Sequence, residues 1–117
     1  MSYDFVNKNS GLSMLNGNKK IYAMLLKKYH DGDLYTKCVE SVASGDMSAA
    51  QTALHTLKGA TGNLHLTALH EKSKELEHTV KMGAMMPTAE EMASLEAVQN
   101  ETIAQIAAIM ANPSLLD

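Results

Sequence analysis

The sequence predicts an all-α protein, an up-and-down four-helix bundle with an additional short N-terminal helix. Apolar residues recur at spacings of three and four along most of the chain, as they do on the buried face of a helix. Residues that cap helices precede these segments, and glycine or proline follows them. No segment shows the alternating pattern of a strand. The 117 residues are expected to form one domain, with an arm and short helix over 1–17, the bundle over 18–111 and a tail over 112–117.

The first two predicted helices are separated by Asn16-Gly17, a pair that favours positive φ and ends a helix. The helix before this pair is short and runs from Ser10 to Leu15. The helix after it begins at Asn18, a good N-cap, and continues to about Tyr29. Its core-facing positions are predicted from their spacing: Ile21, Met24, Leu25 and Tyr29.

The remaining predicted helices span residues 33–45, 47–64, 67–83 and 88–112. Each is predicted to start at a capping side chain: Asp33, Asp46, Thr67 and Thr88, the last in a capping box with Glu91. Glycine ends the first and third of these helices, and Asn112-Pro113 ends the last. The helix over 67–83 should bury Leu69, Ser73, Leu76 and Val80, and the last helix Met92, Leu95, Val98, Thr102, Ile106 and Ile109.

Composition and charge exclude several classes of function. The formal net charge is −3 with both signs interspersed, and the chain has one Phe, no Trp and four Tyr. This is not the basic surface of a nucleic-acid-binding protein. No segment approaches the roughly 18 consecutive apolar residues that a membrane span needs. Because Cys38 is the single cysteine, no internal disulfide can form. We expect a cytoplasmic monomer that binds neither nucleic acid nor membrane.

The predicted helix over 47–64 carries a histidine on its solvent side. Each residue of a helix advances about 100°, so that one stripe contains only apolar residues and a threonine: Ala50, Leu54, Leu57, Thr61 and Leu64. His55 lies on roughly the opposite side and should face water. A neutral imidazole is a good nucleophile, which makes His55 the candidate reactive residue.

The residues around His55 are small or cationic. Lys58, Gly59 and Gly62 follow it by three, four and seven residues, which places them on the same face of the helix. Two glycines in a helix interior cost about 1 kcal/mol each relative to alanine. Their angular position favours clearance for a large partner over packing against another helix. Lys58 can complement an anion placed on the ring.

The segment HTLKGATGNL, followed by LTALHEKSKELE, resembles the signature of the histidine-containing phosphotransfer (HPt) domains of two-component phosphorelays. The shared features are the histidine, an apolar residue two positions on, Lys-Gly, a second small residue and a Leu-Glu pair on the next helix. A weaker resemblance extends from about Leu12 to Met82. The resemblance to this family implies that His55 accepts a phosphoryl group from the aspartate of one receiver domain and yields it to another. The receiver would bring Mg²⁺, so the chain would need no cofactor and would have no independent catalytic activity.

The resemblance also assigns roles to residues around the acceptor. Glu77 stands where the family has a polar residue that hydrogen-bonds the other ring nitrogen of the histidine. Lys81 follows Glu77 by one turn on the same face and is expected to reach the phosphoryl group. The receiver is expected to contact residues around His55 and on the short N-terminal helix: Gln51, Gly59, Gly62, Leu12 and Leu15.

His65 departs from the family, which usually has glycine at this position. A residue with a side chain is strained in a left-handed turn. We therefore expect the turn to differ, with Asn63 adopting the unusual dihedral angle. The other histidines are expected to be ordinary residues of helix surfaces: His30, His70 and His78.

Two other classes of function are compatible with parts of the sequence. In an adaptor bundle, the nine methionines would form a pliable binding surface, although most of them fall at or near predicted core stripes. In a metal-binding bundle, Glu75 and His78 would form a Glu-x-x-His pair. Such sites need a second pair and further inward-facing glutamates, and the sequence has one pair. No metal site is therefore predicted.

Overall fold

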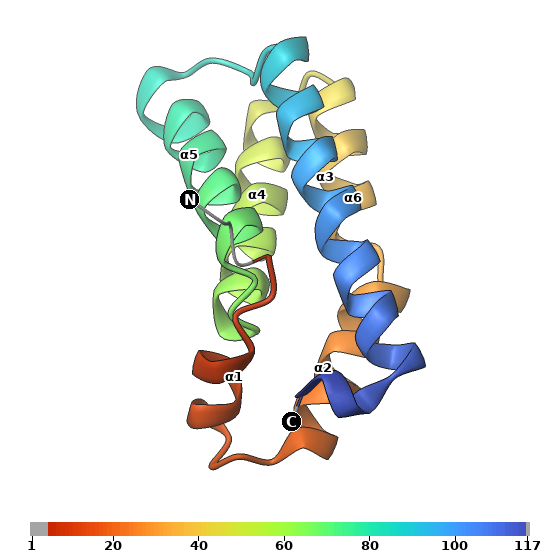
Figure 1. Cartoon of the computed structure of the whole chain (residues 1–117). Coiled ribbons are helices and arrows are strands. Elements are labelled where there is room, and N and C mark those ends of the chain that lie inside the picture. The colour runs from red at the N-terminus through yellow and green to blue at the C-terminus, as the bar shows by residue number, and fades with distance from the viewer. Residues whose placement is uncertain (1–4, 117) are drawn as a thin grey trace.

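The computed structural model describes residues 5–116, and every regular element in this range is helical (Figure 1). The all-α prediction is therefore confirmed for the described range. Residues 1–4 of the predicted arm and residue 117 of the predicted tail lie outside it. The elements are α1 (Lys8–Met14), α2 (Lys19–Asp31), α3 (Leu34–Ala43), α4 (Met47–Asn63), α5 (Thr67–Gly83), α6 (Ala89–Ala111) and the 3₁₀ helix η1 (Pro113–Leu116).

The helices pack side by side into a bundle (Figure 1). Helices α2 and α3 follow one another along one side, and α4 returns in the opposite direction. Helix α5 packs extensively along α4, and α6 packs along both α2 and α5. Because α3 also packs against α4, helix α4 lies between α3 and α5. Its remaining face is open to solvent.

Three of the predicted helix starts are confirmed by side-chain caps, whereas the first helix begins at Lys8 after the N-cap Asn7 and not at Ser10. Asn18 accepts a hydrogen bond from the backbone N–H of Ile21, and Asp46 accepts one from Ala49. Thr88 and Glu91 form the predicted capping box. The prediction for Thr67 is wrong, because Leu66 occupies the N-cap position of α5 and Thr67 is its first helical residue. Asp33 occupies the N-cap position of α3 without a side-chain cap.

The buried face of α2 agrees with the predicted one only at Tyr29. Tyr22, Leu26 and Tyr29 are buried, whereas Ile21 and Met24 are exposed and Leu25 is half-buried. The spacing of apolar residues did not decide which face of α2 is buried, because apolar residues occupy both faces of this helix. The tyrosines turn inward because each hydroxyl finds an acceptor, as buried tyrosines require. Tyr22 donates to the Leu64 carbonyl oxygen (2.7 Å) and Tyr29 to Oε1 of Gln99 (2.6 Å).

The predicted stripes of α4 and α5 are confirmed. All five predicted residues of the α4 stripe are buried, and so are the four of α5. Helix α5 buries two further residues, Ala68 and the charged Glu77. In α6, Met92 and Val98 are half-buried against the core, and the other predicted residues are buried. Gln99 is buried as well, which its bond to Tyr29 explains.

Helix α1 packs on α2, and the residue before α1 is hydrogen-bonded to the turn that follows α4. The backbone N–H of Asn7 donates to the His65 carbonyl oxygen (2.9 Å). Gly11 lies directly on the ring of Tyr22, where a Cβ would come within 2.5 Å of the ring carbons. This close approach accounts for a glycine inside a helix. Leu12 and Leu15 are half-buried and pack against the core.

The expectation that most methionines fall at or near core stripes is wrong for the methionines that the structure describes. Four of them are exposed: Met14, Met24, Met82 and Met85. Three others pack partly buried against the core: Met47, Met92 and Met110. The exposed four lie on α1, on α2, at the end of α5 and just after α5, so that they are distributed over the bundle.

The corrected face of α2 can be tested with two substitutions on the same helix. Leu26→Ala removes a side chain that is fully buried, and we expect it to lower the free energy of unfolding by about 2–5 kcal/mol. Met24→Ala, at a side chain that is 61% exposed, should change it by less than about 0.5 kcal/mol. Urea denaturation measures both values. Equal costs at the two positions would contradict this packing.

Candidate functional site

His55 lies near the middle of α4 on the face that the neighbouring helices leave open. Its side chain is 69% exposed, whereas Leu54 and Leu57 beside it in the sequence are fully buried. Its ring nitrogen Nδ1 lies 2.7 Å from Oε2 of Glu77 on α5. The predicted orientation of His55 toward solvent is confirmed, and the structure brings Glu77 to it.

The carboxylate of Glu77 is buried and contacts two side chains, an ammonium group and an imidazole ring. Its side chain is only 8% exposed. Lys58 of α4 places its ammonium 2.5 Å from Oε1, and His55 contacts the other oxygen. Burial by itself would raise the pKa of Glu77, but hydrogen bonds and charge from Lys58 and His55 outweigh it and hold the pKa below its ordinary value. The carboxylate is therefore ionised at neutral pH.

An ionised carboxylate decides which ring nitrogen of His55 carries hydrogen. A carboxylate only accepts hydrogen bonds, so Nδ1 must be the donor. In the neutral ring, Nε2 then carries the free lone pair. An exposed imidazole with its lone pair fixed on one nitrogen is prepared for nucleophilic attack on an incoming group.

The two glycines on the His55 face have different surroundings. A Cβ built at Gly59 meets no atom within 4 Å, so that position is open. A Cβ at Gly62 would lie 2.9 Å from Nδ1 of His70 on α5. The prediction that the angular position of Gly62 disfavours packing against another helix is wrong, because the ring of His70 occupies the space next to it.

Two contacts show how α4 and α5 align. His55 meets Glu77, and Gly62 meets His70, so positions seven residues apart on one helix match positions seven apart on the other. The same antiparallel alignment places exposed Lys81 level with half-buried Gln51, one turn from His55. Leu12 lies on α1 and Leu15 directly follows it, and both pack partly buried against the hydrophobic core. Their contact with a receiver stays a prediction.

The turn after α4 is left-handed at His65. The φ angle of His65 is 57°, so the expectation that Asn63 would adopt the unusual angle is wrong. Two hydrogen bonds close the helix end, from His65 N–H to the Gly62 carbonyl and from Leu66 N–H to the Thr61 carbonyl. This is a Schellman motif, which requires the left-handed residue directly after the C-cap. The hydrogen bonds of this motif outweigh the preference of histidine for a negative φ angle.

The prediction that His70 is an ordinary surface residue is also wrong. Its ring is half-buried, and Nδ1 lies 2.8 Å from the carbonyl oxygen of Lys58. One feature of the sequence could have indicated this contact. Gly62 and His70 lie on consecutive helices, and antiparallel packing of those helices brings the two positions together.

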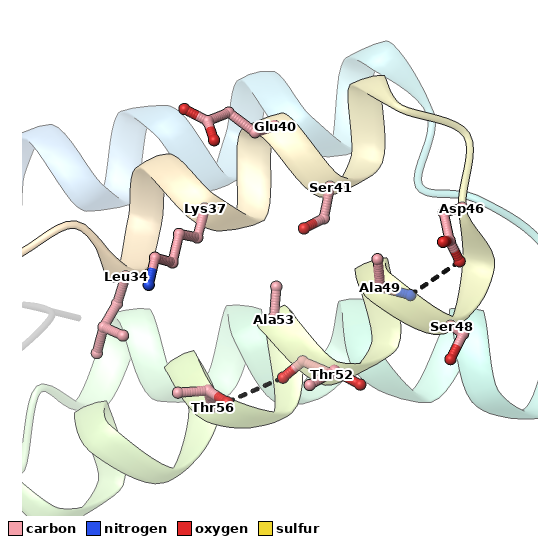
Figure 2. A pocket seen from close by; sticks show the side chains of 10 residues that line it. All are labelled: Leu34, Lys37, Glu40, Ser41, Asp46, Ser48, Ala49, Thr52, Ala53 and Thr56. Atoms are coloured by element: carbon pink, nitrogen blue, oxygen red, sulfur yellow. Dashed lines mark hydrogen bonds between the residues drawn. The ribbon is translucent and has the colours of Figure 1, made fainter.

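An open groove of about 570 Å³ lies between α3 and α4 (Figure 2). Ala49 and Ala53 of α4 leave room for it, and Lys37 and Glu40 of α3 lie on its other side. Thr52 and Thr56 form its edge on α4, and both are exposed. Because these threonines flank His55 in the sequence, the groove opens next to the candidate nucleophile. The sequence pattern had not indicated it.

The structure gives no support to the metal-binding alternative. Glu75 and His78 are exposed on α5, and Glu75 lies 3.7 Å from Lys72. Within residues 5–116, no three His, Cys, Asp or Glu side chains are grouped so that they could hold a metal ion. In the same range no helix is both long and apolar enough to span a membrane.

The lowered pKa of Glu77 makes a prediction about stability in acid. Because folding favours the ionised carboxylate, its stabilisation is complete above the ordinary pKa of 4.5 and is lost as the pH falls through the folded value. Glu77→Gln should therefore lower the melting temperature at pH 5, and this deficit should shrink toward about pH 3. Glu75→Gln, at an exposed site on the same helix, is the control and should change the melting temperature little. A deficit for Glu77→Gln that stays constant over this range would contradict the assignment.

The chain was also compared with known protein families. A family model described as Hpt domain matches residues 32–110, a range that includes α3, α4, α5 and nearly all of α6. No curated protein and no solved structure matches the sequence significantly. Hpt domains are helical phosphocarriers that interact with receiver domains in phosphorelays. The match covers more than half of the chain and contains His55, Lys58 and Glu77, and the chain therefore belongs to the Hpt domain family.

Proposed function

We propose that His55 accepts a phosphoryl group from the aspartyl phosphate of one receiver domain and yields it to the aspartate of another. The observation that carries this proposal is the exposed imidazole whose Nδ1 is held by a buried, ionised carboxylate 2.7 Å away. An ordinary surface histidine has no need of such a partner. Membership of the Hpt domain family supports the same reaction.

The transfer step follows from the hydrogen bond between His55 and Glu77. The lone pair of Nε2 forms a bond to phosphorus while the bond between phosphorus and the aspartate oxygen breaks, and that electron pair stays on the receiver carboxylate. The ring then gains positive charge. Because Nδ1–H continues to donate to Glu77, the nearby carboxylate stabilises this charge, as the aspartate of a catalytic triad does for its histidine. The reverse step passes the group to the second receiver.

Lys58 has two tasks in this proposal. Its ammonium holds one oxygen of Glu77 and so keeps the other oxygen directed at His55. Its side chain is 28% exposed, which leaves part of the cation to complement the phosphoryl oxygens. Lys81, exposed one turn along α5 from Glu77, supplies a second positive charge near the phosphorylated ring. The chain supplies no metal, and Mg²⁺ comes with the receiver.

The proposed docking surface extends from His55 over three regions. The open space at Gly59 lets a receiver approach the ring closely. Thr52 and Thr56 continue the surface into the groove between α3 and α4 (Figure 2). On α1, the exposed Met14 is better placed for an apolar contact than the half-buried Leu12 and Leu15. We propose that the chain acts as a cytoplasmic monomer and has no independent catalytic activity.

The phosphate acceptor can be tested by transfer from a phosphorylated receiver domain. The wild-type protein should acquire a label that is lost in acid and survives alkali, as phosphohistidine does and an acyl phosphate does not. His55→Gln should acquire none, because its amide nitrogen is not nucleophilic. Circular dichroism of the variant serves as the control for folding. Label that still reaches a folded His55→Gln protein would refute the assignment.

The place of Lys58 in the site can be tested by charge reversal. Lys58→Glu should slow transfer by about tenfold or more, because it removes a cation and sets a second carboxylate against Glu77. Lys19→Glu, at an exposed lysine at the start of α2, makes the same change in net charge and should have a smaller effect. Transfer rates under single-turnover conditions provide the comparison. Equal effects of the two reversals would count against the placement of Lys58.

A further inference from the structure

A second histidine, His70, joins α5 to α4 two helical turns away from the contact between His55 and Glu77. Its Nδ1 lies 2.8 Å from the Lys58 carbonyl oxygen. Because a carbonyl oxygen only accepts, Nδ1 carries hydrogen and donates it. The half-buried ring lies against Gly62, where a Cβ would come within 2.9 Å of the same nitrogen.

Both ends of Lys58 are held by α5. Its backbone carbonyl accepts the hydrogen bond from His70, and its ammonium lies 2.5 Å from the Glu77 carboxylate. His70 and Glu77 are seven residues apart, about two turns of helix, so they lie on the same side of α5. A movement of His70 relative to α4 would therefore shift Glu77, the partner of His55, in the same direction.

The hydrogen bond between His55 and Glu77 depends on this alignment. It is a single contact of 2.7 Å between side chains on two helices, and one of those side chains is largely exposed. Functional groups need to be held within about 0.5 Å of their working geometry. The helix backbones offer no direct hydrogen bond to each other, since each helix satisfies its own. The alignment of α4 relative to α5 must therefore be determined by contacts between side chains, or between a side chain and the backbone of the other helix.

We propose that His70 is a positioning residue for phosphotransfer: its bond to the Lys58 carbonyl and its packing on Gly62 set the alignment of α5 against α4 and hold Glu77 on Nδ1 of His55. This inference rests on the proposed function of His55. It also explains Gly62, which admits the ring of His70 rather than the surface of a receiver.

The test compares two substitutions of His70 by NMR of the ring nitrogens of His55. His70→Ala removes the donor, and His70→Asn retains it, because the amide nitrogen of asparagine can occupy the position of Nδ1. In unphosphorylated protein at alkaline pH, the wild type should show hydrogen on Nδ1 of His55. In His70→Ala this tautomer should lose population to the Nε2–H form, and transfer should slow about fivefold. His70→Asn should restore both.

A second pair of substitutions tests the packing against Gly62. Gly62→Ala places a methyl group where the ring of His70 lies, so it should displace the ring and shift the His55 tautomer as His70→Ala does. Gly59→Ala is the matched control, since its methyl group meets no atom within 4 Å. It should leave the tautomer unchanged and raise the melting temperature, because alanine is the better helix former.

The outcomes separate this inference from the proposed function. Wild-type ring signals in His70→Ala, or an asparagine variant that behaves like the alanine variant, would overturn the role of His70 and leave His55 as the acceptor. A wild-type protein that accepts no phosphate would instead overturn the proposed function. The tautomer measurement would still report on the alignment, because it needs no phosphotransfer.

Discussion

The carboxylate of Glu77 lies in a nearly buried position between an imidazole and an ammonium, and the candidate site depends on that arrangement. Burial of an isolated carboxylate is costly, and the penalty is offset when hydrogen-bond donors, one of them a cation, bind both oxygens. Lys58 and His55 do so at 2.5 and 2.7 Å. Each of the three side chains is thus oriented by another, and the exposed ring of His55 has one nitrogen left for a partner.

The fold supports this arrangement by dividing the residues of α4 between two faces. The stripe from Ala50 to Leu64 packs into the core, which fixes the helix, while His55 and Gly59 remain open on the other side. Helix α5 shows the same division, with its apolar stripe in the core and Glu77 at the edge of it. Two rigid helices thereby hold reactive side chains that do not belong to the core.

Much of this could be predicted from the sequence because it follows from local rules. Helical spacing identified the stripes of α4 and α5, and capping chemistry identified Asn18, Asp46 and Thr88 as helix starts. The wrong predictions concern residues whose conformation or burial depends on a contact with a residue distant in the sequence, or on the geometry of a turn. The buried face of α2 is set by acceptors near the end of α4 and on α6, and Gly62 is explained by a histidine on α5. His65 adopts its left-handed angle because the Schellman motif at the end of α4 requires it.

The pairing of Glu77 with His55 came from the resemblance to a family, and the roles of the site residues stay predictions. The burial of Glu77 and its bond to Lys58 could not be read from helical spacing, because a Glu on a helix is ordinarily solvated. The groove beside Thr52 and Thr56 depends on how α3 crosses α4, which no local pattern specifies. Tertiary packing therefore determines the electrostatics of the site, whereas sequence determines which residues are available.

The central claim is that Nε2 of His55 receives the phosphoryl group while Nδ1 stays bonded to Glu77. The most direct measurement is heteronuclear NMR of nitrogen-labelled protein after transfer from a phosphorylated receiver, which identifies the nitrogen coupled to phosphorus. The account predicts one phosphorylated nitrogen, Nε2 of His55, with hydrogen retained on Nδ1. Phosphate on Nδ1, or on any other residue, would contradict it.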